Sequence, residues 1–228
     1  MKKIGEFFKK LFSKENLKKF YRTFIWLMAV MFVIDIVTKW VVFNHFGLEA
    51  MVNGRRSDTG AIPVINNFCY IGGSINDGAA FSLLSGSDAK RVLLLVISLV
   101  MTGLFVGYYV SQYKKLDTWY KVGIALMISG AFGNLIDRAF YWPKTTGFNG
   151  VIDWIIFKFG NWEFAMFNIA DSCLVIGIIV VIIKMIVDEI KAAKEKAKRG
   201  EFKYSPEELE KMNKEQENNH EDEGNQGE

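Results

Sequence analysis

Histidine, cysteine and proline are scarce in this chain. Its 228 residues include two histidines, His45 and His220, two cysteines and three prolines. The sequence has no HExxH pair, no Cys/His zinc cluster and no GxxxxGK[ST] loop that could cradle a phosphate, and two isolated histidines argue against a Ser-His-Asp triad. Metalloenzymes, NTPases and ordinary serine hydrolases are therefore disfavoured.

A basic nucleic-acid-binding stripe and an internal repeat are also missing. The net charge of +3 arises because lysines crowd the first twenty residues and acids the last thirty, so we expect no nucleic-acid partner. Cys69 lies in a polar stretch and Cys173 in an apolar run, and we expect no disulfide. Without a repeat, an inverted-repeat transporter gains no support.

Apolar residues, by contrast, make up half of the chain, and aromatic residues reach 14%. Four runs are long enough to cross a hydrocarbon core of about 30 Å at about 1.5 Å per residue. We therefore predict four transmembrane helices. They cover about 21–43, 91–113, 118–136 and 164–187.

Lysine and arginine define an orientation for these helices. They cluster before the first run, in the short loop around Lys114 and Lys115, and after the fourth run. The positive-inside rule then predicts cytoplasmic termini and outward-facing connections at 44–90 and 137–163. We divide the chain into a basic amphipathic segment (1–20) lying on anionic inner-leaflet lipid, a membrane domain (21–190) and a charged, partly disordered tail (191–228).

The two outward connections also contain short strand-like patterns. The stretches INDGAAFSLLSG and GVIDWIIFKFGNW combine apolar repeats with flanking turn residues. The predicted fold class is an α-helical integral membrane protein with four spans and a small extracytoplasmic β-rich surface element.

Several costly polar residues interrupt the predicted spans near their outer ends. Asn168 and Asp171 lie three apart inside the fourth run, and so on one helical face, where a carboxylate costs about 2.5 to 3.5 kcal/mol on insertion scales. Asp35 in the first run lies at the same depth as Asp171, about 10 to 12 Å below the outer surface. Such residues indicate a functional site by default.

The third run ends outward in SGAFGNLIDR, which carries Asn134, Asp137 and Arg138. A ladder of small residues lies beneath these polar groups, at Ala125, Ser129 and Gly133. Small side chains let a neighbouring helix approach closely, so the polar tip is expected to face the bundle interior.

Purely structural explanations exist for each of these residues. Asp35 and Lys39 are spaced for an ion pair within one helix, with Lys39 snorkelling outward. Asp137 could pair with the neighbouring Arg138, which could also bind a lipid headgroup, and membrane amides often join helices. Asp153 could be a surface carboxylate without a role. These explanations leave open why the costly groups gather at the outer end of the bundle and not at the inner end.

Taken together, these residues resemble those of bacterial lipoprotein signal peptidase, signal peptidase II. The match runs in order through five blocks of sequence, whose combination is specific although each alone is weak. The blocks are DIVTK (Asp35, Lys39), NDGAAFS (Asn76, Gly78, Ala79), GAFGNLIDR (Asn134, Asp137, Arg138), VIDW (Asp153) and FNIAD (Asn168, Asp171).

The resemblance implies a membrane aspartic endopeptidase with Asp153 and Asp171 as its catalytic pair. The other residues of the five blocks would bind substrate or support that pair. They are Asp35, Lys39, Asn76, Gly78, Ala79, Asn134, Asp137, Arg138 and Asn168. Such chemistry requires neither a metal nor an organic cofactor.

The implied substrates are prolipoproteins, cut just before their diacylglyceryl-modified cysteine. The enzyme would lie in the bacterial inner membrane with its site near the extracytoplasmic face, and globomycin-like cyclic peptides would inhibit it. The two alternatives to this hypothesis are a proton-coupled transporter or channel and a non-enzymatic assembly factor. A transporter should carry polar residues toward both faces, and an assembly factor would not need Asp153 and Asp171 as acids.

Overall fold

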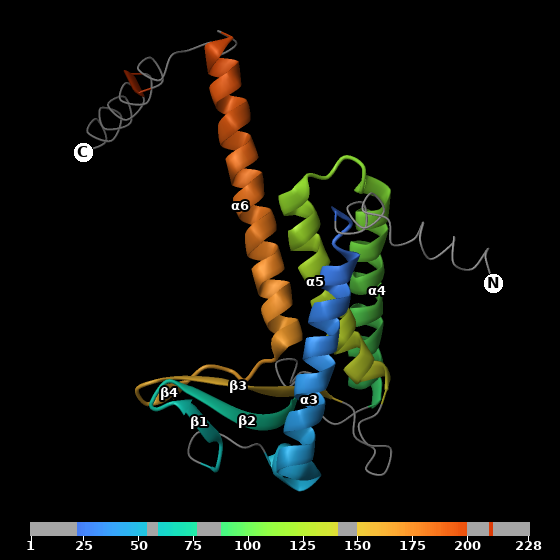
Figure 1. The fold of residues 1–228 in the computed structure, drawn as a ribbon, viewed down its shortest axis with the longest axis vertical. Helices are drawn as coiled ribbons and strands as arrows, with labels where there is room; N and C mark the ends of the chain where they lie inside the picture. Colours follow the sequence, from blue (N-terminus) through green and yellow to red (C-terminus); the bar gives the residue numbers. More distant parts are fainter. Residues whose placement is uncertain (1–21, 54–58, 77–87, 141–149, 200–209, 212–228) are drawn as a thin grey trace, which may run out of the picture. The chain divides into compact units, whose positions relative to one another are not determined.

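The computed structural model describes residues 22–53, 59–76, 88–140, 150–199 and 210–211 (Figure 1). The chain divides into two compact units, Met1–Ile182 and Ile183–Glu228. Four helices contain a stretch long and apolar enough to cross a membrane, which confirms the prediction of four spans. They are α3 (Ile25–Asn53), α4 (Asp88–Gln112), α5 (Thr118–Ala139) and α6 (Ile169–Lys198).

Helix α3 differs from the predicted 21–43 at both ends. It begins at Ile25, directly after Phe24, whose positive φ of 54° interrupts a helix. It continues to Asn53 through a kink at Gly47, where φ is 76° and only glycine is unstrained. The helical turns after the kink bury Met51 completely. The hydropathy pattern missed this extension because it lies beyond the continuous apolar run.

Helices α4 and α5 agree with the sequence within a few residues. Helix α5 begins where predicted because Asp117 caps it, its carboxylate accepting from the Trp119 and Tyr120 backbone N–H groups at 2.9 and 3.1 Å. It ends at Ala139 rather than at residue 136. Asp137 and Arg138 are therefore helical and are positioned by the α5 backbone.

The prediction that the fourth helix starts at residue 164 is wrong. Residues 164–168 are not helical, and two of them are hydrogen-bonded to strand β3 (Val151–Phe159). Phe164 N–H donates to the Phe157 carbonyl at 2.8 Å, and Ile155 N–H donates to the Phe167 carbonyl at 2.8 Å. Apolar, aromatic residues suit a strand as well as a helix, so hydropathy could not separate the two. Helix α6 starts at Ile169.

Helix α6 also continues past the predicted end at 187. In the second unit, Lys184 and Asp188 form an i,i+4 ion pair, and Lys196 and Lys198 lie in the last helical turn, where positive charge is favourable. The beginning of the predicted tail is thus helical. The predicted segment at 1–20 and most of the predicted tail lie outside the described residues.

The predicted β-rich element is a four-stranded antiparallel sheet in the order β1-β2-β3-β4. Its strands are β1 (Ile62–Ile65), β2 (Cys69–Asn76), β3 (Val151–Phe159) and β4 (Trp162–Glu163). The strand predicted within GVIDWIIFKFGNW is confirmed. In the first connection the strand ends at Asn76, earlier than INDGAAFSLLSG suggested, and most of that stretch lies outside the described residues. Cys69 and Cys173 are free, as expected.

The last turns of α3 pack against one face of this sheet. Met51 and Val42 form a buried cluster with Ile152, and Trp154 packs against it. Gly73 in β2 permits this contact, because a Cβ there would lie 2.2 Å from the Met51 sulfur. Side chains alternate along a strand, so Asp153 points to the opposite face from Ile152 and Trp154. Helix α3 therefore does not cover the face of the sheet that carries Asp153, and this face can contact the other helices.

Helices α5 and α6 approach closely along glycines. A side chain at any of three glycines would collide with the facing helix. A Cβ at Gly123 would lie 2.7 Å from the Val181 side chain, and a Cβ at Gly177 would lie 2.6 Å from the Gly123 carbonyl oxygen. A Cβ at Gly130 would lie 2.2 Å from the Ala170 carbonyl oxygen. The predicted ladder of Ala125, Ser129 and Gly133 is buried or in close contact as well. The expectation of close helix approach at this end of α5 is confirmed.

Candidate active site

Two of the predicted site residues cap the N-terminus of α6. Asn168 precedes the helix, and its side-chain oxygen accepts from the Asp171 N–H at 2.9 Å, while the Asp171 carboxylate accepts from the Asn168 N–H at 3.2 Å. This reciprocal pair is a capping box, which satisfies two backbone donors at a helix N-terminus. The Asn-x-x-Asp spacing therefore reflects a helix cap rather than a polar helix face.

Asp35 from α3 contributes a third acceptor to the same helix end. Its carboxylate accepts from the Ala170 N–H at 2.9 Å, so α3 and the start of α6 are joined at one level. The predicted common depth of Asp35 and Asp171 is supported by this contact. The sequence placed Asp171 well inside the fourth helix, however, whereas it lies in the first turn of α6.

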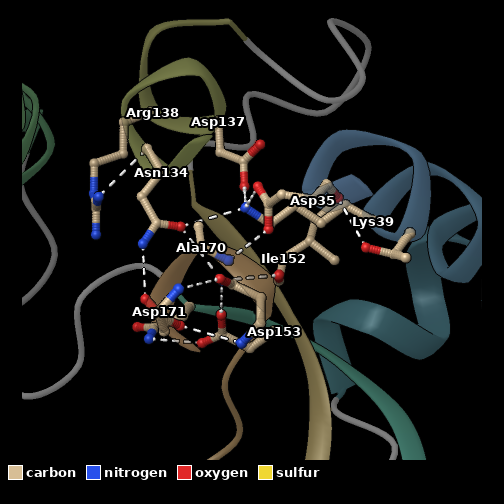
Figure 2. A network of polar contacts seen from close by, with 12 residues as sticks. Asp35, Lys39, Asn134, Asp137, Arg138, Ile152, Asp153, Ala170 and Asp171 are labelled. Carbon is tan, nitrogen blue, oxygen red and sulfur yellow. Dashed lines mark hydrogen bonds and ion pairs between the residues drawn. The ribbon is translucent and has the colours of Figure 1, made fainter. Parts of the chain in front are cut away.

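Lys39 lies between two buried carboxylates. Its ammonium nitrogen is 2.7 Å from the Asp35 carboxylate and 2.8 Å from that of Asp137, and the side chain is only 3% exposed (Figure 2). The snorkelling interpretation of Lys39 is therefore wrong. Asp137 pairs with Lys39 rather than with Arg138, because the helical turn points adjacent residues in different directions. Removing one member of such a cluster leaves an uncompensated buried charge, which typically costs about 3 to 5 kcal/mol.

Asn134 connects this ionic cluster to Asp171. Its amide nitrogen donates to the Asp171 carboxylate at 2.7 Å, and its amide oxygen accepts from Lys39 at 3.3 Å. The same oxygen accepts from the Asn168 side chain at 3.3 Å. The orientation of the Asn134 amide is thereby fixed, with its donor directed at the carboxylate.

Asp153 reaches the site from β3, on the sheet face opposite Met51. Its two carboxylate oxygens each accept from an amide, one from Asn168 at 2.7 Å and the other from Asn76 at 2.9 Å. Asn168 thus donates to both carboxylates, through its backbone N–H to Asp171 and through its side chain to Asp153. The structure brings the two predicted catalytic aspartates together around this one residue.

Burial, and next the charge of Asp171, raise the pKa of Asp153 to about 7. Hydrogen bonds from Asn76 and Asn168 act in the opposite direction, because they stabilise the carboxylate form. A carboxyl with a pKa near neutrality, beside a second carboxyl, is the arrangement in which one proton is shared between two acids.

Arg138 lies at the edge of this network. Its guanidinium donates to the Ser98 hydroxyl of α4 at 3.1 Å and to the Asn134 carbonyl at 3.3 Å. Ser98 was not predicted from the sequence, although a hydroxyl within the apolar run of α4 was a weak signal for it. Gly78 and Ala79 lie outside the described residues. Within the described part of the chain, no group of three His, Cys, Asp or Glu side chains could hold a metal ion.

The chain is similar in sequence to a known protein family. The model of the family described as signal peptidase (SPase) II matches residues 27–187, more than half of the chain, and this span includes every described residue of the site. The chain belongs to the signal peptidase II family. Lipoprotein signal peptidases of Bacillus pumilus and Halalkalibacterium halodurans are 36% and 32% identical to it over 166 and 167 residues. These matches cover 72% and 73% of this chain and 94% of each relative.

Solved structures agree with this membership. Two bacterial membrane enzyme structures, both determined by the in meso method, are 30% identical to the chain with TM-scores of 0.57 and 0.56. The two matches cover 73% and 72% of this chain, and 89% and 92% of the respective solved chains. As a signal peptidase II, the protein is an aspartic-type peptidase with four membrane-spanning helices and a small antiparallel sheet. The transporter and assembly-factor alternatives are set aside.

Proposed function

We propose that this signal peptidase II hydrolyses the peptide bond before the diacylglyceryl-modified cysteine of prolipoproteins, with Asp153 and Asp171 as its catalytic pair. The observation that carries the proposal is the arrangement around Asn168, which donates to both carboxylates. The influence of the Asp171 charge on the pKa of Asp153 supports the same pairing. The names of the curated relatives supply the substrate class.

The chemistry follows from two carboxyls that share one proton. Asp153, whose pKa of about 7 leaves a large fraction protonated near neutral pH, donates a hydrogen bond from that protonated form to the oxygen of the scissile carbonyl. The Asp171 carboxylate accepts a proton from a water molecule, whose oxygen attacks the carbonyl carbon. In the resulting tetrahedral intermediate, the carbonyl oxygen has received the Asp153 proton.

Breakdown of the intermediate restores the starting state. The leaving amine nitrogen takes the proton that Asp171 received from water, and the carbon–nitrogen bond breaks. A hydroxyl proton of the intermediate returns to Asp153 as the new carboxyl group forms. Each aspartate ends the cycle in its original protonation state, so no metal or other cofactor is needed to balance the reaction.

The remaining site residues are proposed to act in two groups. Asn76, Asn134 and Asn168 orient the two carboxylates, since each donates to one or both of them. Asp35, Lys39 and Asp137 hold α3, α5 and the start of α6 together at the level of the pair. Arg138, Gly78 and Ala79 remain predicted substrate-binding or supporting residues, and inhibition by globomycin-like cyclic peptides remains a prediction.

The test uses two peptides with the same lipobox sequence, one with a diacylglyceryl group on its cysteine and one without it. Purified protein in detergent is expected to cut the lipidated peptide directly before the cysteine and to leave its twin intact. Asp153→Asn serves as the matched inactive control. Equal cleavage of both peptides would overturn the proposed substrate, and cleavage by the Asn variant would overturn the proposed mechanism.

A further inference from the structure

One face of the sheet carries a continuous cluster of aromatic rings. We name it the aromatic shelf. Its members are Phe68, Phe157, Phe159, Trp162, Phe164 and Phe167. Neighbouring rings lie with their centroids between 5.2 and 5.9 Å apart. Four members are among the exposed large apolar side chains of the molecule, with Phe159 53% and Trp162 59% exposed.

The shelf lies on the same sheet face as Asp153. Side chains alternate along β3, so Asp153, Phe157 and Phe159 share one face. Strand pairing places Trp162 opposite Phe159, and an isolated bridge places Phe167 opposite Ile155, on that face as well. Strand β3 therefore connects the carboxylate to the exposed rings.

Helix α6 begins on this same face. Asn168, which caps it, contacts Asp153, and the shelf residue Phe167 directly precedes the cap. The first turns of α6 expose apolar side chains such as Val175, Ile176 and Ile179. Because this helix spans the membrane, the aromatic face continues into a lipid-facing surface.

We propose that the aromatic shelf is a lipid-binding surface, which rests in the headgroup region of the leaflet where α6 begins and fixes the depth of Asp153. Tryptophan is enriched at that level of a bilayer, where its apolar ring and its polar N–H are both satisfied, and phenylalanine is common on apolar faces that lie at the headgroup boundary. A charged or peptide partner is less well matched, because the exposed members are apolar rings. The depth function, unlike the lipid contact, rests on the proposed prolipoprotein cleavage.

The lipid contact is tested first, in proteoliposomes made with phosphatidylcholine brominated at a shallow or a deep acyl position. The Trp162 signal is the difference in fluorescence between wild type and Trp162→Phe. We expect shallow bromines to quench this signal more strongly than deep ones and than aqueous acrylamide. Quenching by acrylamide without quenching by brominated lipid would overturn the proposal.

The depth function is tested with the double variant Phe159→Ser, Trp162→Ser, because both side chains are more than half exposed. Cleavage of the diacylated peptide is expected to fall about fivefold or more in vesicles and much less in detergent, which imposes no bilayer depth. Trp119→Ser is the control, because Trp119 is 61% exposed but lies at the other end of α5 from Asn134.

The outcomes separate the two claims. An unchanged vesicle rate, or an equal fall in vesicles and detergent, would overturn the depth function. Failure of the wild type to cut any lipidated peptide would instead count against the proposed function, and the Trp162 quenching would still decide the lipid contact.

Discussion

At the scale of single residues, the site is organised by amides rather than by cations. Asn76, Asn134 and Asn168 place four donors on the two carboxylates, counting the backbone N–H of Asn168. Amide donors lower the pKa of a carboxyl less than a neighbouring cation would, because they add no charge, so burial can keep the pKa of Asp153 near neutrality. The single buried lysine of the network is occupied by Asp35 and Asp137. Three predictions follow from this division of roles.

Asp153→Asn and Asp171→Asn should each abolish detectable cleavage, because an amide cannot cycle the proton. Their effects on stability should differ. The folded pKa of Asp153, about 7, exceeds the ordinary value of 3.8, so this residue stabilises the fold at low pH and loses that contribution as pH rises toward 7. An Asn side chain can accept from only one of the two amides that bind Asp153, which costs stability at every pH. Thermal unfolding should therefore show Asp153→Asn more stable, relative to wild type, at pH 8 than at pH 5.

Asp171→Asn should lose a hydrogen bond in the same way. Its carboxylate accepts from both the Asn168 N–H and the Asn134 amide, and an Asn side chain can accept only one of these. Its melting temperature should therefore fall slightly below that of the wild type. Residual turnover by either variant, above that of an enzyme-free blank, would contradict the catalytic assignment.

Asn76→Ala should move the alkaline limb of the pH profile upward. Asn76 donates to the Asp153 carboxylate and lowers its pKa, so removing the donor favours the protonated form. The profile of kcat/KM for the wild type should be bell-shaped, with limbs that belong to the coupled pair. A downward shift, or none, would show that Asn76 does not control the pair. Val64→Ala, on an exposed strand, is the control.

Substitutions at Asn168 should separate its capping role from its donor role. Asn168→Ser keeps a good cap but removes the amide that reaches Asp153, whereas Asn168→Ala removes both. We expect reduced turnover in both variants, but a loss of stability of about 1 kcal/mol only in the Ala variant. Equal stability of the two variants would mean that the side-chain cap contributes little.

At the scale of helices and strands, glycines determine how closely α5 and α6 can approach. Gly130→Ala should reduce both activity and thermal stability, because its Cβ would meet the Ala170 carbonyl and push the start of α6 away from Asn134. Gly103→Ala in α4 is the matched control, since nothing lies within 4 Å of a Cβ there. The control should be neutral or slightly stabilising, by about 0.5 to 1 kcal/mol. Equal effects of the two substitutions would refute the close-packing argument.

Most of the helices and strands could be predicted from the sequence, and the errors in that prediction have physical causes. Four apolar runs predicted four helices, because length and hydropathy alone decide whether a segment can span a bilayer. The same hydropathy does not distinguish a buried strand from a helix, so residues 164–168 were assigned to the wrong element. The pairing of Lys39 with Asp137 requires knowing how α3 and α5 pack, which no local pattern contains. The pairing of Asp153 with Asp171 was predicted through the family resemblance.

At the scale of the whole molecule, the orientation in the membrane remains a prediction. Lysines and arginines at both ends of the chain and around Lys114 predict cytoplasmic termini. In a variant whose Cys69 and Cys173 are replaced by serine, Ser57→Cys should react with an impermeant maleimide added outside intact cells. Labelling only after the cells are opened would reverse the orientation and move the site to the cytoplasmic side. Lys115→Cys is the control and should show the opposite pattern.

The buried Lys39 has a consequence for how the protein is assembled during synthesis. Helix α3 can enter the bilayer with its own ion pair complete, because Asp35 and Lys39 are one turn apart on the same helix. Helix α5 emerges later and carries Asp137, whose counter-ion is on α3. We therefore expect the third span to become stable at its final depth only when it has docked against the first. Insertion and docking would then be dependent steps, in which the earliest helix to enter binds a later one.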